Sequence, residues 1–187
     1  IDNVPLQQWP LKTLRQNIGY VQQEHFLFSD SLAENIAFGL EQTDEQRIDE
    51  AIKVSRLAND LDQFPAGLET RIGERGLTLS GGQQQRSAIA RAIIRHPAVL
   101  LLDDALSSVD THTEEEILQH IEPLMKARTT LIVSHRISTV RLADRIIVME
   151  NGEIAQEGTH DELLQQGGIY REMYDRQQLE TELEDWA

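Results

Sequence analysis

Short apolar runs that alternate with helix-like stretches are the feature that most constrains the fold of this chain. They lie at 18–21, 99–102, 131–133 and 146–149 and consist mostly of leucine and β-branched residues. Runs of this kind are typical of strands buried on both faces of a parallel sheet, with helices as the crossover connections. The sequence therefore predicts an α/β fold with a parallel sheet core.

Local signals mark where several elements begin or turn. Capping-box patterns that begin at Thr43 and Thr159 predict two helix starts, because each pairs a threonine with a glutamine or glutamate three residues later. Asn151-Gly152 predicts a two-residue hairpin turn after the run at 146–149. The acidic stretch 169–186 predicts a helix with Leu179, Leu183 and Trp186 on one face, which either packs on its own domain or binds a partner.

Composition narrows the classes of protein. The 187 residues include 17 basic and 32 acidic residues, and the formal charge of −15 argues against a nucleic-acid partner, since phosphate binding needs clustered Lys and Arg. The chain contains no cysteine, which excludes disulfides and thiolate metal sites. No apolar run approaches the roughly 18 residues that a membrane-spanning helix needs. The sequence predicts a globular domain of ordinary size.

Polar side chains follow three of the predicted strands. Gln23 follows the first, Asp103 and Asp104 follow the second, and His135 follows the third. Ligands of open parallel sheets bind outside the carboxyl ends of the strands, so these residues should share one edge. Carboxylates there suit Mg²⁺, which takes one or two protein oxygens and completes its shell with water and phosphate.

The segment LSGGQ at 79–83 opens a predicted amphipathic helix. Ser80 and Gln83 fit a capping box, which would explain the segment by helix initiation alone. Gly81 and Gly82 then occupy the first turn, where each costs about 1 kcal/mol relative to alanine. Glycines are better explained there by a phosphate that approaches the backbone amides at the positive end of the helix dipole.

LSGGQ, LLLDD, SSVD and the later SHR occur in an order and spacing that resemble the nucleotide-binding domain of ATP-binding-cassette (ABC) proteins. The resemblance covers essentially the whole chain and implies the ABC-ATPase (P-loop NTPase-like) fold, with a helical subdomain at about 30–95, the remaining core at 96–165 and a C-terminal helix at 166–187. It implies ATP and Mg²⁺ as ligands. The implied roles are Gln23 as the Q-loop ligand of Mg²⁺ and water, Leu79, Ser80, Gly81, Gly82 and Gln83 as the signature motif that closes over ATP of the opposite subunit, Asp103 as the Walker B ligand of Mg²⁺, Asp110 as the D-loop aspartate, and His135 as the catalytic switch histidine.

TRIGERG at 70–76 resembles the X-loop of ABC exporters, which contacts the membrane domains. Gly73, Glu74, Arg75 and Gly76 carry this resemblance, and the alternative is an ordinary glycine-rich surface loop. The resemblance implies a multidrug- or lipid-type exporter whose own transmembrane domain is a partner of this chain. It would place the chain at the cytoplasmic face of the inner membrane.

Asp104 stands where most of the family has a catalytic glutamate. The shorter side chain retracts the carboxylate by roughly 1.5 Å, one C–C bond length, and misplacing a catalytic group by about 1 Å can cost on the order of a hundredfold in rate. The resemblance thus implies the degenerate half of a heterodimer, which supplies an intact signature motif to a second half-transporter. The alternative is a homodimer in which Asp104 still serves as the base.

No G-x-x-x-x-G-K-[ST] motif occurs among the 187 residues. In the family the P-loop lies upstream of a stretch like IDNVPL, so we expect a piece of a longer protein, inactive alone because the phosphate-binding loop and the first strands are missing. Two other functions stay open. One is a soluble ABC ATPase of DNA maintenance or translation, and the other is a regulatory subunit that binds ATP without hydrolysing it.

Overall fold

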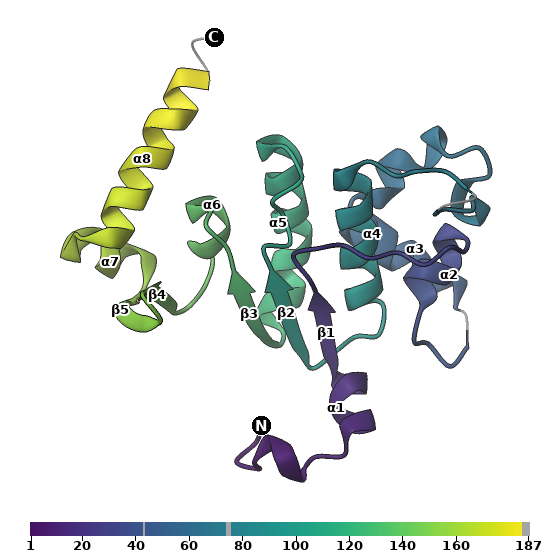
Figure 1. Cartoon of the computed structure of the whole chain (residues 1–187), viewed down its shortest axis with the longest axis horizontal. Coiled ribbons are helices and arrows are strands. Elements are labelled where there is room, and N and C mark those ends of the chain that lie inside the picture. Colours follow the sequence, from purple (N-terminus) through teal and green to yellow (C-terminus); the bar gives the residue numbers. More distant parts are fainter. Residues whose placement is uncertain (43, 74–75, 185–187) are drawn as a thin grey trace. The chain divides into compact units, whose positions relative to one another are not determined.

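The computed structural model of the chain describes residues 1–42, 44–73 and 76–184. It contains two compact units, Ile1–Leu131 and Ile132–Ala187. Figure 1 shows the elements of each unit, coloured along the sequence. The first unit holds η1 (Leu6–Gln8), α1 (Leu11–Asn17), β1 (Ile18–Val21), α2 (Leu32–Ala37), α3 (Glu45–Val54), η2 (Leu57–Gln63), η3 (Gly67–Glu69), α4 (Gly81–Ile93), β2 (Val99–Asp103) and α5 (Thr111–Lys126), where η marks a 3-10 helix.

Strands β1 and β2 form the parallel pair at the centre of the first unit. Ile18 pairs with Val99, and the register continues to Val21 and Leu102. Helix α4 packs closely on β1, because a Cβ at Gly19 would lie 2.5 Å from the carbonyl oxygen of Ala92. Only glycine allows this approach. The strand pair and α4 therefore have fixed positions relative to one another.

A group of helices occupies the stretch between β1 and β2. Figure 1 shows α2, α3 and α4 beside one another, and contacts of α4 with α2, α3 and η2 join them. Helix α3 begins after Asp44, whose carboxylate accepts hydrogen bonds from the amides of Gln46 and Arg47. The helix start expected at Thr43 is therefore wrong by one residue, and Thr43 itself lies outside the described residues. Asp44 caps two amides at once, so no box with Gln46 is needed.

Strand β3 (Thr129–Val133) joins the two units, and the order of the three-stranded sheet is β1-β2-β3. Its residues are not buried on both faces, since Leu131 and Val133 are more than half exposed. The run at 146–149 also departs from the expectation of a buried strand in this sheet. It forms β4 (Ile146–Glu150), which pairs antiparallel with β5 (Glu153–Gly158) in a separate hairpin.

The second unit also contains α6 (Ile137–Val140), α7 (His160–Gln166) and α8 (Ile169–Glu184). Its core consists of Ile137, Ile146, Leu163 and Tyr170. Asn151 and Gly152 both have positive φ angles, as the predicted hairpin turn requires. The capping box at Thr159 is present as predicted. These local signals were sufficient because turn and cap chemistry depend on only a few neighbouring residues.

The exposed face of α8 contradicts one expectation. Leu179 and Leu183 are 60% and 70% exposed, so they do not pack on their own domain. Trp186, expected on the same face, lies outside the described residues. The helix is instead anchored by the opposite side of its first turns, where Tyr170 is buried and Met173 and Tyr174 are partly buried. Spacing along the helix places these three residues on one face.

Candidate functional site

The carboxyl ends of β1 and β2 bring two of the predicted site segments together. Because Val21 pairs with Leu102, Gln23 and Asp103 lie just beyond neighbouring strand positions at one edge. The Tyr20 hydroxyl donates a hydrogen bond of 3.2 Å to Asp103 Oδ2. Desolvation and this carboxylate acceptor raise the pKa of Tyr20. Tyr20 was missed by sequence reasoning, which read it only as a strand residue.

Asp104 directly follows β2 and has a left-handed backbone conformation. Its φ of +47° is uncommon for residues other than glycine, although aspartate and asparagine tolerate it better than most. The Asp104 carbonyl accepts hydrogen bonds from the amide and the hydroxyl of Ser107, at 3.2 and 2.9 Å. The chain therefore turns sharply at Asp104 and is held in the turn. This conformation is a structural reason for aspartate here that is independent of catalysis.

Gln85 connects α4 with the loop that follows Asp104. Its fully buried side-chain amide accepts a hydrogen bond of 3.1 Å from the amide of Ser108 and donates a longer one, 3.4 Å, to the carbonyl of Asp104. Sequence reasoning missed this residue. The available signal was a glutamine one turn before Ala88 and Ile89, on the apolar face of the helix. Segment 79–83 and the Asp104 loop thus belong to one packed arrangement.

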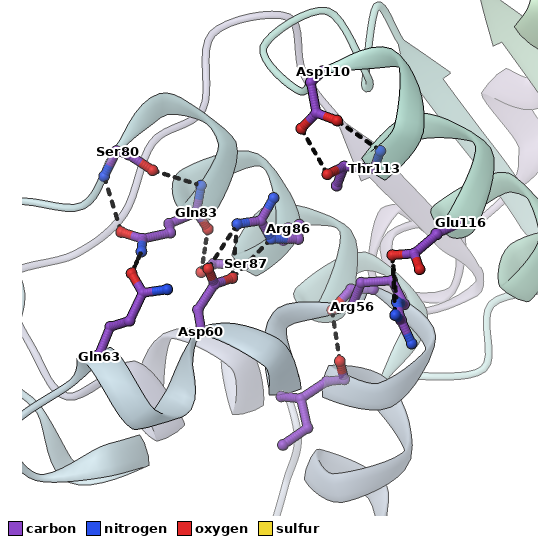
Figure 2. Close-up of polar contacts among 12 residues, drawn as sticks. Arg56, Asp60, Gln63, Ser80, Gln83, Arg86, Ser87, Asp110, Thr113 and Glu116 are labelled. Atoms are coloured by element: carbon purple, nitrogen blue, oxygen red, sulfur yellow. Dashed lines mark hydrogen bonds and ion pairs between the residues drawn. The ribbon is translucent and has the colours of Figure 1, made fainter.

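The start of α4 is the capping box that the sequence predicts. Ser80 Oγ accepts from the amide of Gln83 at 3.3 Å, and Gln83 Oε1 accepts from the amide of Ser80 at 3.1 Å (Figure 2). Helix geometry leaves the amides of Gly81 and Gly82 without partners inside the helix. Both amides lie at the positive end of the dipole, which favours an anion there.

The two glycines at this helix start differ in what surrounds them. A Cβ at Gly81 would meet Ser108 at 3.5 Å, an ordinary contact, so packing within this chain does not require glycine there. At Gly82 the Cβ would lie 3.3 to 3.4 Å from Arg86 and the Ser108 carbonyl, which is tight. Close packing therefore accounts for Gly82 in part, whereas Gly81 keeps open an exposed approach to the backbone.

A buried ion pair fixes the same helix against η2. Arg86 donates two hydrogen bonds, of 2.8 and 2.9 Å, to the two carboxylate oxygens of Asp60 (Figure 2). The side chains are only 13% and 9% exposed. In a second pair, Arg56, the residue before η2, binds Glu116 of α5 at 3.0 Å. Sequence reasoning missed both pairs, because their partners lie 26 and 60 residues apart along the chain.

Asp110 is the N-cap of α5. Its carboxylate accepts from the amide of Thr113 at 2.9 Å and from the hydroxyl of Thr113 at 2.6 Å (Figure 2). These hydrogen bonds lower the pKa of Asp110. The cap's contribution to stability is therefore complete above the ordinary aspartate pKa of about 3.9 and is lost only as pH falls through the lowered value. The aspartate is thus ionised and held in place at neutral pH.

The glycines of the loop at 71–77 are sterically required. A Cβ at Gly73, which has a φ of +103°, would lie 2.5 Å from Ser29 Oγ, and a Cβ at Gly76 would lie 2.3 Å from the Arg71 carbonyl oxygen. The Gly76 amide donates to the Gly73 carbonyl at 3.0 Å. Glu74 and Arg75 lie outside the described residues, so their proposed contacts stay predictions. Gly73 therefore packs directly against Ser29 in the segment before α2.

An aromatic pocket lies beside the β1 edge. It has a volume of about 350 Å³ and is lined in part by Phe26, Phe28, Phe38 and Arg91. The Phe28 ring lies 5.0 Å from that of Phe26 and 4.5 Å from that of Phe38, centre to centre. Arg91 lies 6.0 Å from the Phe28 centroid. Phe26 and Phe38 are 63% and 54% exposed, so they form an accessible apolar surface with a cationic neighbour.

His135 belongs to the second unit, and its position relative to Asp103 stays a prediction. Its carbonyl accepts a hydrogen bond from Gln177 on α8. Within the described ranges, no group of three or more His, Cys, Asp and Glu side chains could hold a metal ion. Asp103 with one neighbouring oxygen still fits Mg²⁺, which takes most of its ligands from water and phosphate. None of the described helices is long and apolar enough to span a membrane.

The sequence of this chain is similar to those of known ABC transporter proteins. A family model described as "ABC transporter" matches residues 1–107. The probable multidrug resistance ABC transporter ATP-binding/permease protein YheI of Bacillus subtilis (strain 168) is 50% identical over 184 residues, which cover 98% of this chain and 32% of that protein. The multidrug resistance-like ATP-binding protein MdlA of Escherichia coli (strain K12) is 45% identical over 183 residues, covering 98% and 31%.

A relative named as a flippase and a solved exporter structure also match nearly the whole of this chain. The ATP-dependent lipid A-core flippase of Chromobacterium violaceum is 45% identical over 95% of this chain and 30% of that protein. The structure of a bacterial Atm1-family ABC exporter with ATP bound matches with a TM-score of 0.89 and 40% identity, over 95% of this chain and 31% of that one. This chain spans about a third of the length of the curated relatives that it matches.

Proposed function

Because this chain belongs to the ABC transporter family, we propose that it is the nucleotide-binding module of an exporter that hydrolyses ATP. The observation that carries the proposal is the exposed start of α4, where Gly81 leaves backbone amides open although packing within the chain does not require glycine. A phosphate of ATP is the anion that this helix start fits. Multidrug compounds and lipids are the substrate classes that the names of relatives suggest.

The residues at the strand ends take distinct roles in this proposal. Asp103 and Gln23 would hold Mg²⁺, which would neutralise charge on the phosphates. Asp104 orients or activates the attacking water, and His135 donates toward the terminal phosphate. Asp110, as an ionised cap of α5, holds the loop between β2 and α5 that faces the second subunit. Leu79, Ser80, Gly81, Gly82 and Gln83 contact ATP of that subunit.

We propose that the second subunit is a half-transporter with its own nucleotide-binding domain, and that the pair is a heterodimer in which Asp104 marks the slower site. Two explanations of why residue 104 is an aspartate compete. In the first, aspartate is present because it tolerates the left-handed backbone at this position. In the second, the shorter side chain weakens the catalytic base because its carboxylate reaches less far. A homodimer with a working Asp104 is the alternative partner arrangement.

The membrane domain is the other proposed partner. The name of one relative includes the word permease. The aromatic pocket of Phe26, Phe28 and Phe38 offers an apolar binding site beside the strand edge where Gln23 lies. A short apolar segment of the permease, with a carboxylate that pairs with Arg91, would fit this pocket. Such a contact would place the module at the cytoplasmic face of the cell membrane and would couple the site to the transport path.

Cysteine labelling tests the pocket contact, because the chain has no cysteine of its own. Phe26→Cys should react with a maleimide at least roughly tenfold more slowly in the complete membrane protein than in this chain alone, because the permease would cover it. Asp49→Cys, at an exposed position on α3, is the matched control and should react equally in both. Equal rates for Phe26→Cys in the two proteins would contradict the proposed contact between the pocket and the permease.

ATP hydrolysis by the complete protein tests the function itself. We expect a steady-state ATPase that EDTA removes and Mg²⁺ restores. With its partner subunit, the Asp104→Glu variant should hydrolyse faster than the parent protein, because the added methylene extends the carboxylate by roughly 1.5 Å. Asp104→Asn keeps a residue that tolerates the left-handed backbone and removes the charge, so it separates backbone from base.

The outcomes of this assay separate the proposals. Absence of any Mg²⁺-dependent hydrolysis would contradict the ATPase function. A protein that hydrolyses rapidly without a second kind of subunit and loses activity in Asp104→Asn would show that Asp104 is a working base in a homodimer. A rate that Asp104→Asn leaves unchanged, with a gain in Asp104→Glu, supports the heterodimer.

A further inference from the structure

We propose that Gln177 of α8 is a positioning residue for His135, and that the C-terminal helix thereby sets the conformation of the switch segment 134–137. The inference rests on the proposed role of His135 in ATP hydrolysis. All of the groups involved belong to the second unit, so the argument needs no contact between the two units. The contact that carries the inference is a hydrogen bond from the Gln177 side chain to the main-chain carbonyl of His135, 42 residues earlier in the chain.

Both ends of the Gln177 amide bind the main chain of this segment. Gln177 Nε2 donates to the carbonyl oxygen of His135 at 2.7 Å, and Gln177 Oε1 accepts from the amide of Ile137 at 2.9 Å. The amide of Arg136, between them, donates to Ser134 Oγ at 3.0 Å. One side chain therefore fixes the peptide groups on both sides of Arg136, which limits rotation of the backbone at His135.

The face of α8 that carries Gln177 is packed in place. Tyr170, Met173 and Tyr174 precede it at helical spacing of seven, four and three residues, and they pack with Ile137 in the core of the second unit. Gln177 itself is partly buried, whereas its neighbour Gln178 is exposed. The packing holds Gln177 opposite the switch segment, so few side-chain rotamers are lost when its hydrogen bonds form.

The hydrogen bonds of Gln177 should keep His135 in one orientation for catalysis. A histidine that must meet a phosphate has to be held close to one orientation, since a displacement of about 1 Å can cost on the order of a hundredfold. Hydrogen bonds from a packed helix supply this support for an otherwise exposed residue. We call the two hydrogen bonds of the Gln177 side chain the clamp. Loss of the clamp should lower the rate of turnover more than it lowers the affinity for ATP, because the histidine would act mainly when charge develops on the phosphate.

A matched pair of variants tests the clamp in this chain. Gln177→Met keeps the length and volume of the side chain and loses both hydrogen bonds, and Gln178→Met is the exposed control. In the ¹⁵N-isoleucine-labelled chain, amide exchange of Ile137 should accelerate roughly tenfold in Gln177→Met, the effect of one lost hydrogen bond. Gln178→Met should leave it unchanged. Unchanged exchange in Gln177→Met would overturn the clamp.

The complete transporter tests the consequence. Gln177→Met should lower kcat by roughly three- to tenfold with KM for ATP within about twofold, whereas Gln178→Met should match the parent protein. Gln177→Glu keeps the acceptor for Ile137 and faces the His135 carbonyl with a carboxylate, so it should not restore turnover. If His135→Ala abolishes hydrolysis and Gln177→Met changes nothing, the positioning role is overturned and the proposed function stands. If His135→Ala hydrolyses normally, both fail.

Discussion

Replacing Ser80 by arginine should abolish ATP hydrolysis by the complete transporter, with a loss on the order of a hundredfold or more. Ser80 is exposed at the start of α4, and the next residue, Gly81, leaves an open approach to the backbone. An arginine at this position would fill that approach with a long side chain. Because the nucleotide would be held between two subunits, the block prevents closure of the pair over ATP.

The effect of Ser80→Arg must be separated from loss of the helix cap. Removing an N-cap costs about 1 kcal/mol of stability, and the capping box of α7 offers a control with the same chemistry. Thr159→Arg removes the cap of α7, which lies in the second unit and outside the proposed site. Steady-state ATPase rates in matched membranes should fall for Ser80→Arg alone. Equal losses in both variants would indicate a stability effect and contradict the contact with ATP.

Only part of this arrangement could be predicted from the sequence. The runs at 18–21 and 99–102 predicted β1 and β2, and Asn151-Gly152 predicted the turn of the β4–β5 hairpin, because these depend on patterns of a few adjacent residues. The expectation that 146–149 is buried on both faces was wrong, since Ile147 and Met149 are 46% and 64% exposed. Apolar composition indicates a strand but does not specify its neighbour, and this strand pairs with the segment after its own turn.

The polar contacts of the site show the other limit of sequence reasoning. Motif spacing predicted that Gln23 and Asp103 lie at one strand edge, since the carboxyl ends of parallel strands meet there. Gln85 and Gln177 could not be predicted in this way. Each binds main-chain groups that are distant along the chain. The place of Gln85 on the apolar face of α4 indicates that its side chain is buried, but it does not identify the partner. Only the packed structure brings the two ends together.

The second large effect should follow from Asp60→Asn. This substitution leaves Arg86 charged in a site where the two side chains are 13% and 9% exposed. Removing one partner of a buried ion pair costs about 3–5 kcal/mol, because the remaining charge is desolvated without compensation. In a Trp186→Phe background, fluorescence of Trp9 reports on the first unit. The urea midpoint should fall by roughly 1–3 M for a typical dependence on denaturant.

A surface pair in the same unit is the matched control for this prediction. Asp49 and Lys53 on α3 form an ion pair whose side chains are 59% and 66% exposed, so Asp49→Asn should cost less than about 1 kcal/mol. The double variant Asp60→Leu with Arg86→Met should recover most of the loss, because it removes the stranded charge and keeps the volume. Equal midpoints for Asp60→Asn and Asp49→Asn would contradict a structural role for the buried pair. Since Arg86 lies in the turn that follows Gly82, its ion pair with Asp60 also holds the exposed helix start, for which we propose a contact with ATP.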